Sequence, residues 1–156
     1  MISEKHTNNP HEFYMQRCIE LAALAQADGE VPVGAVVVHN GEIIAEGYNQ
    51  PISTHDPSAH AEMIALRKAA QHLENYRLAD VTLYVTLEPC PMCAGLMVHA
   101  RVNTLVFGTH DPRTGSAGSA FDLLNGEKLN HRVECISGVL QEECSLQLKE
   151  FFRSKR

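Results

Sequence analysis

The feature that most constrains the fold is an apolar, β-branched segment that turns back on itself. Residues 33–38 (VGAVVV) have the composition of a strand, and Asn40-Gly41 offers the positive φ angles of a tight hairpin turn. Residues 43–47 then return as a second strand. Because residues 33–38 are apolar at almost every position, this strand is expected to lie centrally in a sheet that is covered on both faces.

The rest of the chain alternates between helical and strand patterns. A first helix is expected from Asn9, which can cap it, to Asp28-Gly29, which ends it, with Pro10 at the first position. After the hairpin and a polar loop over 49–58 come, in order, helix 59–73, strand 81–86, helix 91–101, strand 104–107, a Gly- and Ser-rich loop 109–119, a short helix 121–124, strand 133–139 and helix 141–153. Strands joined through helices pair mostly in parallel, and the hairpin adds one antiparallel pair. The sequence therefore predicts an α/β fold in which residues 1–156 form a single domain, a three-layer α/β/α structure around a mixed five-stranded sheet.

The composition excludes several classes of protein. A chain of 156 residues suits one domain with a sizeable core. The net charge of −6 argues against broad nonspecific binding to nucleic acid, so no DNA partner is expected and any RNA contact needs a local basic patch. No apolar segment is long enough to cross a bilayer, and the polar start resembles neither a secretory signal nor a transit peptide, so a cytoplasmic protein without membrane contact is expected.

Five cysteines are also informative. An odd number, in a chain without an apparent export signal, argues against a disulfide framework. Two of the five, Cys90 and Cys93, lie in the segment Pro89-Cys90-Pro91-Met92-Cys93, where a strand is expected to pass into a helix. At this spacing the two sulfurs lie on one side of a first helical turn, and the N–H groups there favour thiolates. Such a pair forms half of a tetrahedral zinc site.

A second strand-to-helix junction contains His60-Ala61-Glu62. Residues two apart point to nearly opposite sides of a helix, so His60 and Glu62 can serve one site only if the end of the helix faces it. Asp56-Pro57-Ser58 just upstream favours a helix start through a cap and a favoured proline. His60 then supplies a third zinc ligand, and Glu62 stays off the metal beside the remaining coordination position.

Three protein ligands and a free carboxylate are typical of a catalytic zinc site. The fourth position is left for water, whose pKa zinc lowers toward ~7. Glu62 can accept a proton from this water, pass it to a ring nitrogen and then protonate a departing amine. The predicted reaction is hydrolytic deamination with release of ammonia.

Other interpretations of the same residues remain open. Cys90 and Cys93 alone could be a thiol–disulfide redox pair, although His60-x-Glu62 upstream favours zinc. A closed structural zinc site would need a fourth ligand from Cys18, Cys135 or Cys144, whose apolar surroundings are instead typical of inert buried thiols. A zinc-dependent deaminase could also act on a free nucleobase or nucleoside of the guanine or cytosine type.

The paired motifs H-x-E and P-C-x-x-C are the zinc signature of nucleobase deaminases. With them the sequence resembles the cytidine deaminase superfamily and, within it, the bacterial tRNA-specific adenosine deaminases. The resemblance lies in segments 30–38, 47–51, 56–67, 82–102, 107–119, 130–134 and 151–156. It implies a cytidine deaminase-like fold, one zinc ion per subunit and a homodimer with active sites near the subunit interface. It also implies that adenosine becomes inosine at the wobble position (34) of an arginine tRNA anticodon, with the target base flipped into the pocket.

The resemblance also assigns roles to individual residues. His60, Cys90 and Cys93 match the zinc ligands, and Glu62 matches the proton shuttle. Asn49 matches the residue that hydrogen-bonds the target base, and Val33 a residue that lines the pocket. Asp111 matches a contact to the anticodon loop, while Phe151 and Arg153 fall on a C-terminal helix that faces the RNA. From local sequence alone, Asn49 and Asp111 are also ordinary turn residues, and a cation near a helix C-terminus is favourable in any protein.

Overall fold

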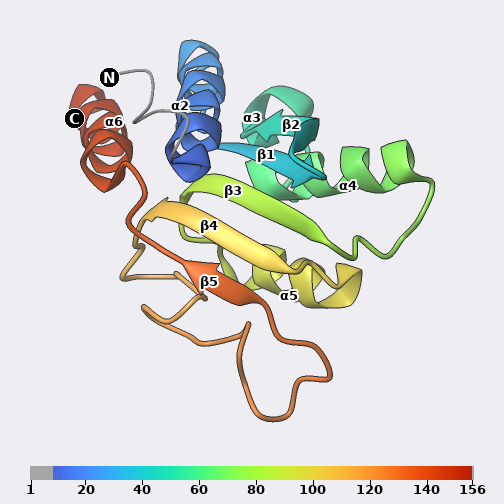
Figure 1. The fold of residues 1–156 in the computed structure, drawn as a ribbon. Coiled ribbons are helices and arrows are strands. Elements are labelled where there is room, and N and C mark those ends of the chain that lie inside the picture. Colours follow the sequence, from blue (N-terminus) through green and yellow to red (C-terminus); the bar gives the residue numbers. More distant parts are fainter. Residues whose placement is uncertain (1–8, 156) are drawn as a thin grey trace.

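A five-stranded mixed sheet forms the middle layer of the computed structural model, which describes residues 9–155 (Figure 1). The strands are β1 (Gly34–His39), β2 (Glu42–Tyr48), β3 (Val81–Leu87), β4 (Thr104–Thr109) and β5 (Glu134–Ile136), in the spatial order β2-β1-β3-β4-β5. The β3–β4 and β4–β5 pairs are parallel, whereas β1 is antiparallel to both of its neighbours. The prediction of a single antiparallel pair was wrong, because the connection from β2 to β3 crosses over β1 and leaves it antiparallel on both sides.

The predicted hairpin is confirmed. Asn40 and Gly41 have φ angles of 53° and 78°, which the tight turn between β1 and β2 requires. The register slips once: Val37 pairs with Ala45 and Val38 pairs with Ile43, so Ile44 is the extra residue of a bulge in β2. Five of the six residues of β1 are buried, so the strand lies inside the sheet with both faces covered, as its apolar sequence predicts.

Helices cover both faces of the sheet, which confirms the three-layer architecture. Figure 1 shows α2 (Pro10–Ala27) and α6 (Gln141–Ser154) on one face and α4 (Ala61–Leu73) and α5 (Pro91–Ala100) on the other. Successive residues of β1 point alternately into two cores: Ala35 and Val37 pack toward α4 and α5, and Val36 packs toward α2 and α6. The α2 helix begins as predicted, since the Asn9 side chain accepts a hydrogen bond from the Glu12 backbone N–H.

The connections differ from prediction in four places. A short helix, α3 (Pro51–Thr54), lies within the loop expected at 49–58. The α4 helix begins at Ala61 rather than 59, because the Asp56 side chain accepts hydrogen bonds from Ser58 instead of capping the helix. No helix forms at 121–124, where residue 122 instead bridges to residue 117. The β5 strand ends at Ile136, before Gly138 adopts a positive φ of 84°. Within residues 9–155, no helix has the length and apolar character that crossing a membrane requires.

Candidate metal centre and active site

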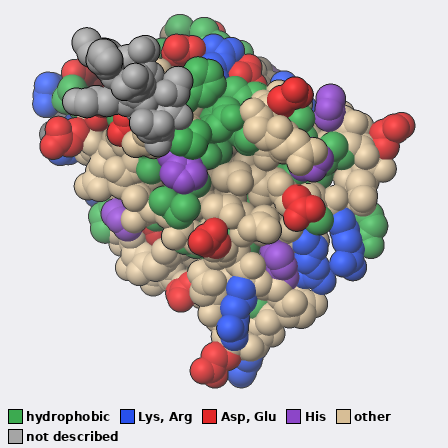
Figure 2. All heavy atoms as spheres, viewed as in Figure 1, with side chains coloured by type: hydrophobic (Ala, Val, Ile, Leu, Met, Phe, Trp, Pro, Cys, Tyr) green, Lys and Arg blue, Asp and Glu red, His purple; other side chains and the backbone are tan. Residues whose placement is uncertain are grey.

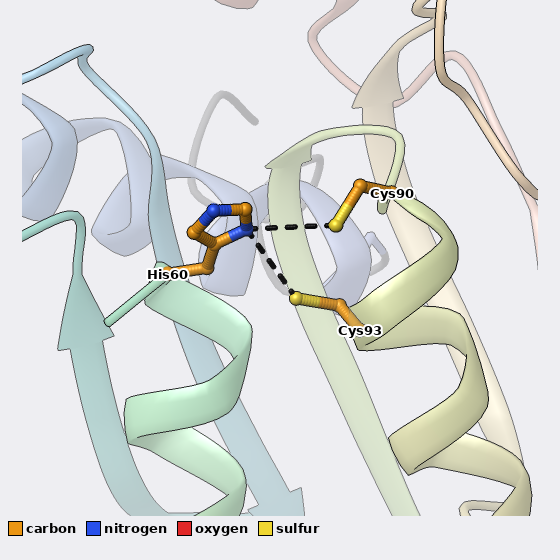
Figure 3. A group of neighbouring side chains, drawn as sticks. All are labelled: His60, Cys90 and Cys93. Atoms are coloured by element: carbon orange, nitrogen blue, oxygen red, sulfur yellow. Dashed lines mark hydrogen bonds between the residues drawn. The ribbon is translucent and has the colours of Figure 1, made fainter. Parts of the chain in front are cut away.

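Two helix N-termini meet at the end of the sheet where the predicted site lies. His60 is the N-cap of α4, Cys90 is the N-cap of α5, and Cys93 follows in the first turn of α5. Figure 3 shows the three side chains pointing toward one another from these two helices. The His60 Nδ1 atom lies 3.5 Å from the Cys90 Sγ atom and 3.6 Å from the Cys93 Sγ atom. The three residues predicted as ligands are therefore brought together, although 30 residues separate His60 from Cys90 along the chain.

The donor atoms have the spacing that a zinc ion requires. Zn–N and Zn–S bonds at a tetrahedral angle place nitrogen and sulfur about 3.6 Å apart, which matches both measured distances. Among the residues that the structure describes, these three are the only group of three or more histidine, cysteine or acidic side chains placed to hold a metal ion. Cys18 and Cys144 belong to the core on the opposite face of the sheet, so neither supplies a fourth ligand.

The two thiols have opposite pKa shifts because they share a proton. Hydrogen bonds from Cys93 and from His60 lower the pKa of Cys90 to about 4, and the N-terminus of α5 favours the same charge. The hydrogen bond that Cys93 makes to Cys90, together with burial, raises the pKa of Cys93. These contacts therefore favour negative charge on Cys90 over Cys93. A bound zinc ion would take both as thiolates and release the shared proton.

Glu62 lies in the first turn of α4 and is only 4% exposed. Burial raises the pKa of this carboxyl group to about 7, although the nearby His60 opposes the shift. A carboxyl group with a pKa near neutrality can both accept and donate a proton at physiological pH. A divalent cation nearby would lower this pKa and favour the carboxylate that accepts the first proton.

Asn49 follows β2 and is tied to the start of α4. Its Oδ1 atom accepts a hydrogen bond of 2.9 Å from the Ala61 N–H, and its own N–H donates to the Val33 carbonyl at 3.1 Å. The Asn49 side chain therefore caps the helix that carries His60 and Glu62. Because the oxygen faces an amide donor, the Nδ2 group points away and keeps its two protons for another acceptor. Val33 itself is 4% exposed and packs in the core beside α4.

A groove of about 910 Å³ runs between the loop 110–114 and α6. Arg153 and Asp111 both line it, as do Lys149, Phe152 and Lys155, which the sequence patterns did not assign to a site. Their signal is the spacing of Lys149, Phe152 and Arg153, which are three and four residues apart and so lie on one side of α6. On the face drawn in Figure 2, acidic and basic side chains are interspersed. The groove is thus a local concentration of cations on a chain whose net charge is −6.

Two of the residues expected to contact RNA have other contacts in the structure. The Asp111 carboxylate accepts hydrogen bonds from the backbone of Arg113 and Thr114 and so shapes its own turn. Phe151 is only 6% exposed, whereas its neighbour Phe152 is 49% exposed and lines the groove. The free aromatic face beside the cations is therefore that of Phe152. Arg156, the last residue of the segment 151–156 that carries part of the resemblance, lies outside the described residues.

A three-layer α/β/α fold with a histidine and two cysteines at two helix starts, beside a buried glutamate, defines the class of zinc-binding nucleobase deaminases. The chain belongs to this class: residues 8–109 match the family model described as the cytidine and deoxycytidylate deaminase zinc-binding region. This membership agrees with the ligand set in the structure and makes zinc the cofactor of the site.

The chain is similar over most of its length to individual deaminases of this class. The tRNA-specific adenosine deaminase of Haemophilus influenzae is 53% identical over 146 residues, which cover 93% of this chain and 84% of that protein. A solved structure from a study of A-to-I editing by tRNA:A34 deaminases is 35% identical, with a TM-score of 0.85, and covers 87% of this chain and 99% of that chain. A guanine deaminase from Nitrosomonas europaea is 27% identical, with a TM-score of 0.76, over 90% of this chain and 83% of that chain.

Proposed function

We propose that this protein hydrolyses adenosine to inosine at the wobble position (34) of a tRNA anticodon, with an arginine tRNA as substrate. The observation that carries the proposal is the geometry of His60, Cys90 and Cys93 at zinc-ligand spacing beside the buried Glu62. The identity of 53% with a tRNA-specific adenosine deaminase supports adenosine in tRNA as the substrate.

The reaction depends on what these side chains do with protons. When bound, one zinc ion per subunit supplies an acidified water molecule as the nucleophile near neutral pH. The Glu62 carboxylate takes a proton from that water and delivers it to the ring nitrogen next to the carbon under attack. Glu62 then takes the remaining proton from the added hydroxyl group and passes it to the departing amine, so that ammonia leaves and the carbonyl of inosine forms. Burial of Glu62 excludes bulk water from these transfers.

Substrate contacts are proposed for five residues, Asn49, Val33, Asp111, Arg153 and Phe152, with Phe151 as a buried support behind them. Asn49 holds the flipped base through its Nδ2 protons, and Val33 shapes the wall of the pocket. Asp111 and Arg153 face the anticodon loop across the groove that they line. The buried ring of Phe151 has no face free for a base, so its proposed role is to support α6 behind the groove. The exposed ring of Phe152 is the one proposed to stack on a base.

We further propose that the enzyme is a cytoplasmic homodimer with no DNA partner. Support for the dimer comes from apolar side chains exposed on the helices around the site. Ile52 in α3 is 69% exposed and Met92 in α5 is 39% exposed. Light scattering of the purified protein tests this assembly: a mass of one subunit at micromolar concentration would reject the dimer.

The decisive experiment offers the purified protein an arginine tRNA anticodon stem-loop and, separately, free adenine, guanine and cytosine. The expected result is inosine in the RNA only, with one zinc per chain by elemental analysis. Ammonia from guanine alone would favour the second candidate, a free-base deaminase, which the similarity to the Nitrosomonas guanine deaminase supports. A protein without stoichiometric zinc that forms a Cys90–Cys93 disulfide would be a thiol–disulfide oxidoreductase instead.

A further inference from the structure

Glu88 is a buried carboxylate that the proposed reaction does not use. It follows β3 directly, and its side chain is fully shielded from solvent. Its Oε1 atom accepts a hydrogen bond of 2.9 Å from the Asp111 N–H, and its Oε2 atom accepts bonds of 2.9 Å from Ala117 and 3.1 Å from Ser119. The Ser119 hydroxyl donates to Oε1 as well. One carboxylate therefore receives three backbone N–H groups and one hydroxyl from a single loop, 110–119.

The loop is built around this carboxylate. A Cβ atom added at Gly115 would lie 2.4 Å from the Glu88 carboxyl carbon, so only glycine lets the backbone approach this closely. The Glu88 backbone N–H also donates to the Thr109 carbonyl, and the Ser116 N–H donates to the Pro89 carbonyl. Burial alone would raise the pKa of Glu88, but the hydrogen bonds from Ser119, Asp111 and Ala117 lower it below its ordinary value. A converging set of N–H groups of this kind favours a charged carboxylate.

The same loop forms one wall of the basic groove. His110, Asp111 and Arg113 line the groove opposite Lys149 and Arg153 of α6. His110 contacts Glu88 and Ser119 as well: its Nδ1 atom lies 3.1 Å from the Ser119 hydroxyl and 3.5 Å from the Glu88 carboxylate. The separation of the two walls therefore depends on a side chain that does not itself line the groove.

We infer that Glu88 is a positioning residue for RNA, which fixes the loop 110–119 so that the groove against α6 is formed before the substrate arrives. Without its carboxylate, three backbone N–H groups lose their acceptor, and the loop samples positions in which the cations do not converge. The RNA must then order the loop on binding, which weakens affinity without altering the zinc chemistry. This inference rests on the proposed function for the identity of the ligand.

The test compares Glu88→Gln with the milder change Ser119→Ala, which removes the hydroxyl that donates to Glu88 and contacts His110 but keeps the three backbone N–H donors. Stem-loop affinity is measured by fluorescence anisotropy, and KM and kcat by inosine formation, with zinc content determined for each variant. Glu88→Gln is expected to raise Kd and KM about tenfold, with kcat within about twofold and zinc unchanged; Ser119→Ala is expected to shift Kd in the same direction by less. Glu46→Gln is the control, since it alters a carboxylate on β2, an edge strand of the sheet, that is paired with Arg17, and should bind RNA normally.

Hydrogen exchange of the amides at 111, 117 and 119 provides a readout that does not depend on activity. These amides should exchange faster in Glu88→Gln, while those of β3 stay protected. Unchanged Kd and unchanged exchange would overturn the inference, as would a parallel loss of zinc and kcat, which would make Glu88 a support of the metal centre. If the unaltered protein binds the stem-loop but forms no inosine, the proposed reaction fails while the affinity and exchange measurements still decide the role of Glu88.

Discussion

At the scale of single residues, the start of α4 determines what two polar side chains can do. Glu62 is buried in the first turn, where its pKa rises to about 7 because the carboxylate loses solvation. Asn49 comes from the end of β2 and occupies the first free N–H of the same helix with its oxygen. One side chain is thereby available as a proton carrier and the other as a hydrogen-bond donor, although both are adjacent to the same helix end.

Replacing Glu62 with Ala should separate chemistry from metal binding. The variant is expected to keep one zinc per chain, because Glu62 is not among the three grouped ligands. Its kcat for inosine formation should fall by about 10²- to 10⁴-fold, the usual contribution of a general acid–base group. Elemental analysis and single-turnover kinetics check both expectations. Glu20→Gln, an exposed change on α2, is the control, and a Glu62→Ala variant with normal kcat would remove Glu62 from the mechanism.

Asn49 has two separable roles, and two substitutions distinguish them. Asn49→Ala should lower the free energy of unfolding by about 1 kcal/mol through loss of the α4 cap and should also reduce kcat/KM. Asn49→Asp keeps an oxygen for the Ala61 N–H but loses the Nδ2 protons, so it should retain stability and still lose activity. Urea denaturation and inosine kinetics measure the two effects. Equal activity in Asn49→Asp and the unaltered protein would leave Asn49 with a structural role only.

Local sequence patterns predicted the three metal ligands, but they did not predict the hydrogen bonds of Asn49 and Glu88 around the site. The spacing of Cys90 and Cys93 and the H-x-E motif are short-range features, so the amino-acid sequence alone predicts the metal ligands. The cap that Asn49 provides joins residues 12 apart, and Glu88 accepts from residues 23 to 31 positions later. The cap depends on how β2 meets α4, and the Glu88 contacts depend on how β3, β4 and the loop after β4 come together; no local pattern specifies either arrangement. Which of Phe151 and Phe152 is buried and which is exposed likewise depends on how α6 is rotated against the sheet.

At the scale of elements, close contact between β2 and α4 positions the half of the site that carries His60. A Cβ atom at Gly47 would lie 2.6 Å from the Ala61 carbonyl and 2.9 Å from the Ala65 N–H, both in the backbone of α4. Gly47→Ala should therefore displace the helix, lower the free energy of unfolding by about 1–3 kcal/mol and weaken zinc binding.

Gly95→Ala is the matched control for this substitution. Gly95 lies in the interior of α5 with open space where the Cβ atom would go, so alanine should stabilise the protein by up to about 1 kcal/mol. Thermal unfolding and zinc titration measure both variants. If Gly47→Ala were as stable as Gly95→Ala, the close packing of β2 on α4 would not control the site.

The elements themselves were predicted well where pattern and tertiary context agree. Both strands of the hairpin, β3, α5 and α6 lie within one residue of where the sequence places them. The ends of the hairpin strands are set by the Asn40-Gly41 turn, and the start of α5 by Pro91 at its first position. The failures fall in connections. The α3 helix forms because its first N–H groups, those of Ile52 and Ser53, donate to the buried Glu30 carboxylate, a contact made across 22 and 23 residues. The segment 121–124 instead pairs with 116–118.

At the scale of the whole molecule, the metal centre joins helices α4 and α5, which make few direct contacts with each other. His60 belongs to α4 and the two cysteines to α5, so zinc would cross-link the two helices on one face of the sheet. Removing zinc with a chelator should lower the melting temperature, because the binding free energy contributes to folding only in the native state. Cys90→Ala should melt at a lower temperature from the outset and show no further change with chelator. An equal response in both proteins would mean that the chelator acts elsewhere.

The charge distribution of the whole molecule makes a separate prediction for RNA binding. The net charge of −6 repels RNA at long range, so attachment has to come from the cations that line the groove beside α6. Each phosphate neutralised by a cation releases counterions, and log Kd should therefore rise linearly with log salt concentration. Arg153→Ala should reduce this slope by about one phosphate contact, whereas Lys68→Ala, which removes the same charge from α4 beside a different pocket, should leave the slope unchanged. Anisotropy titrations at several salt concentrations measure both. Equal slopes in the two variants would mean that Arg153 contacts no phosphate. A flat salt dependence in the unaltered protein would mean that the RNA is held by base stacking, on Phe152 or within the pocket, rather than by its phosphates.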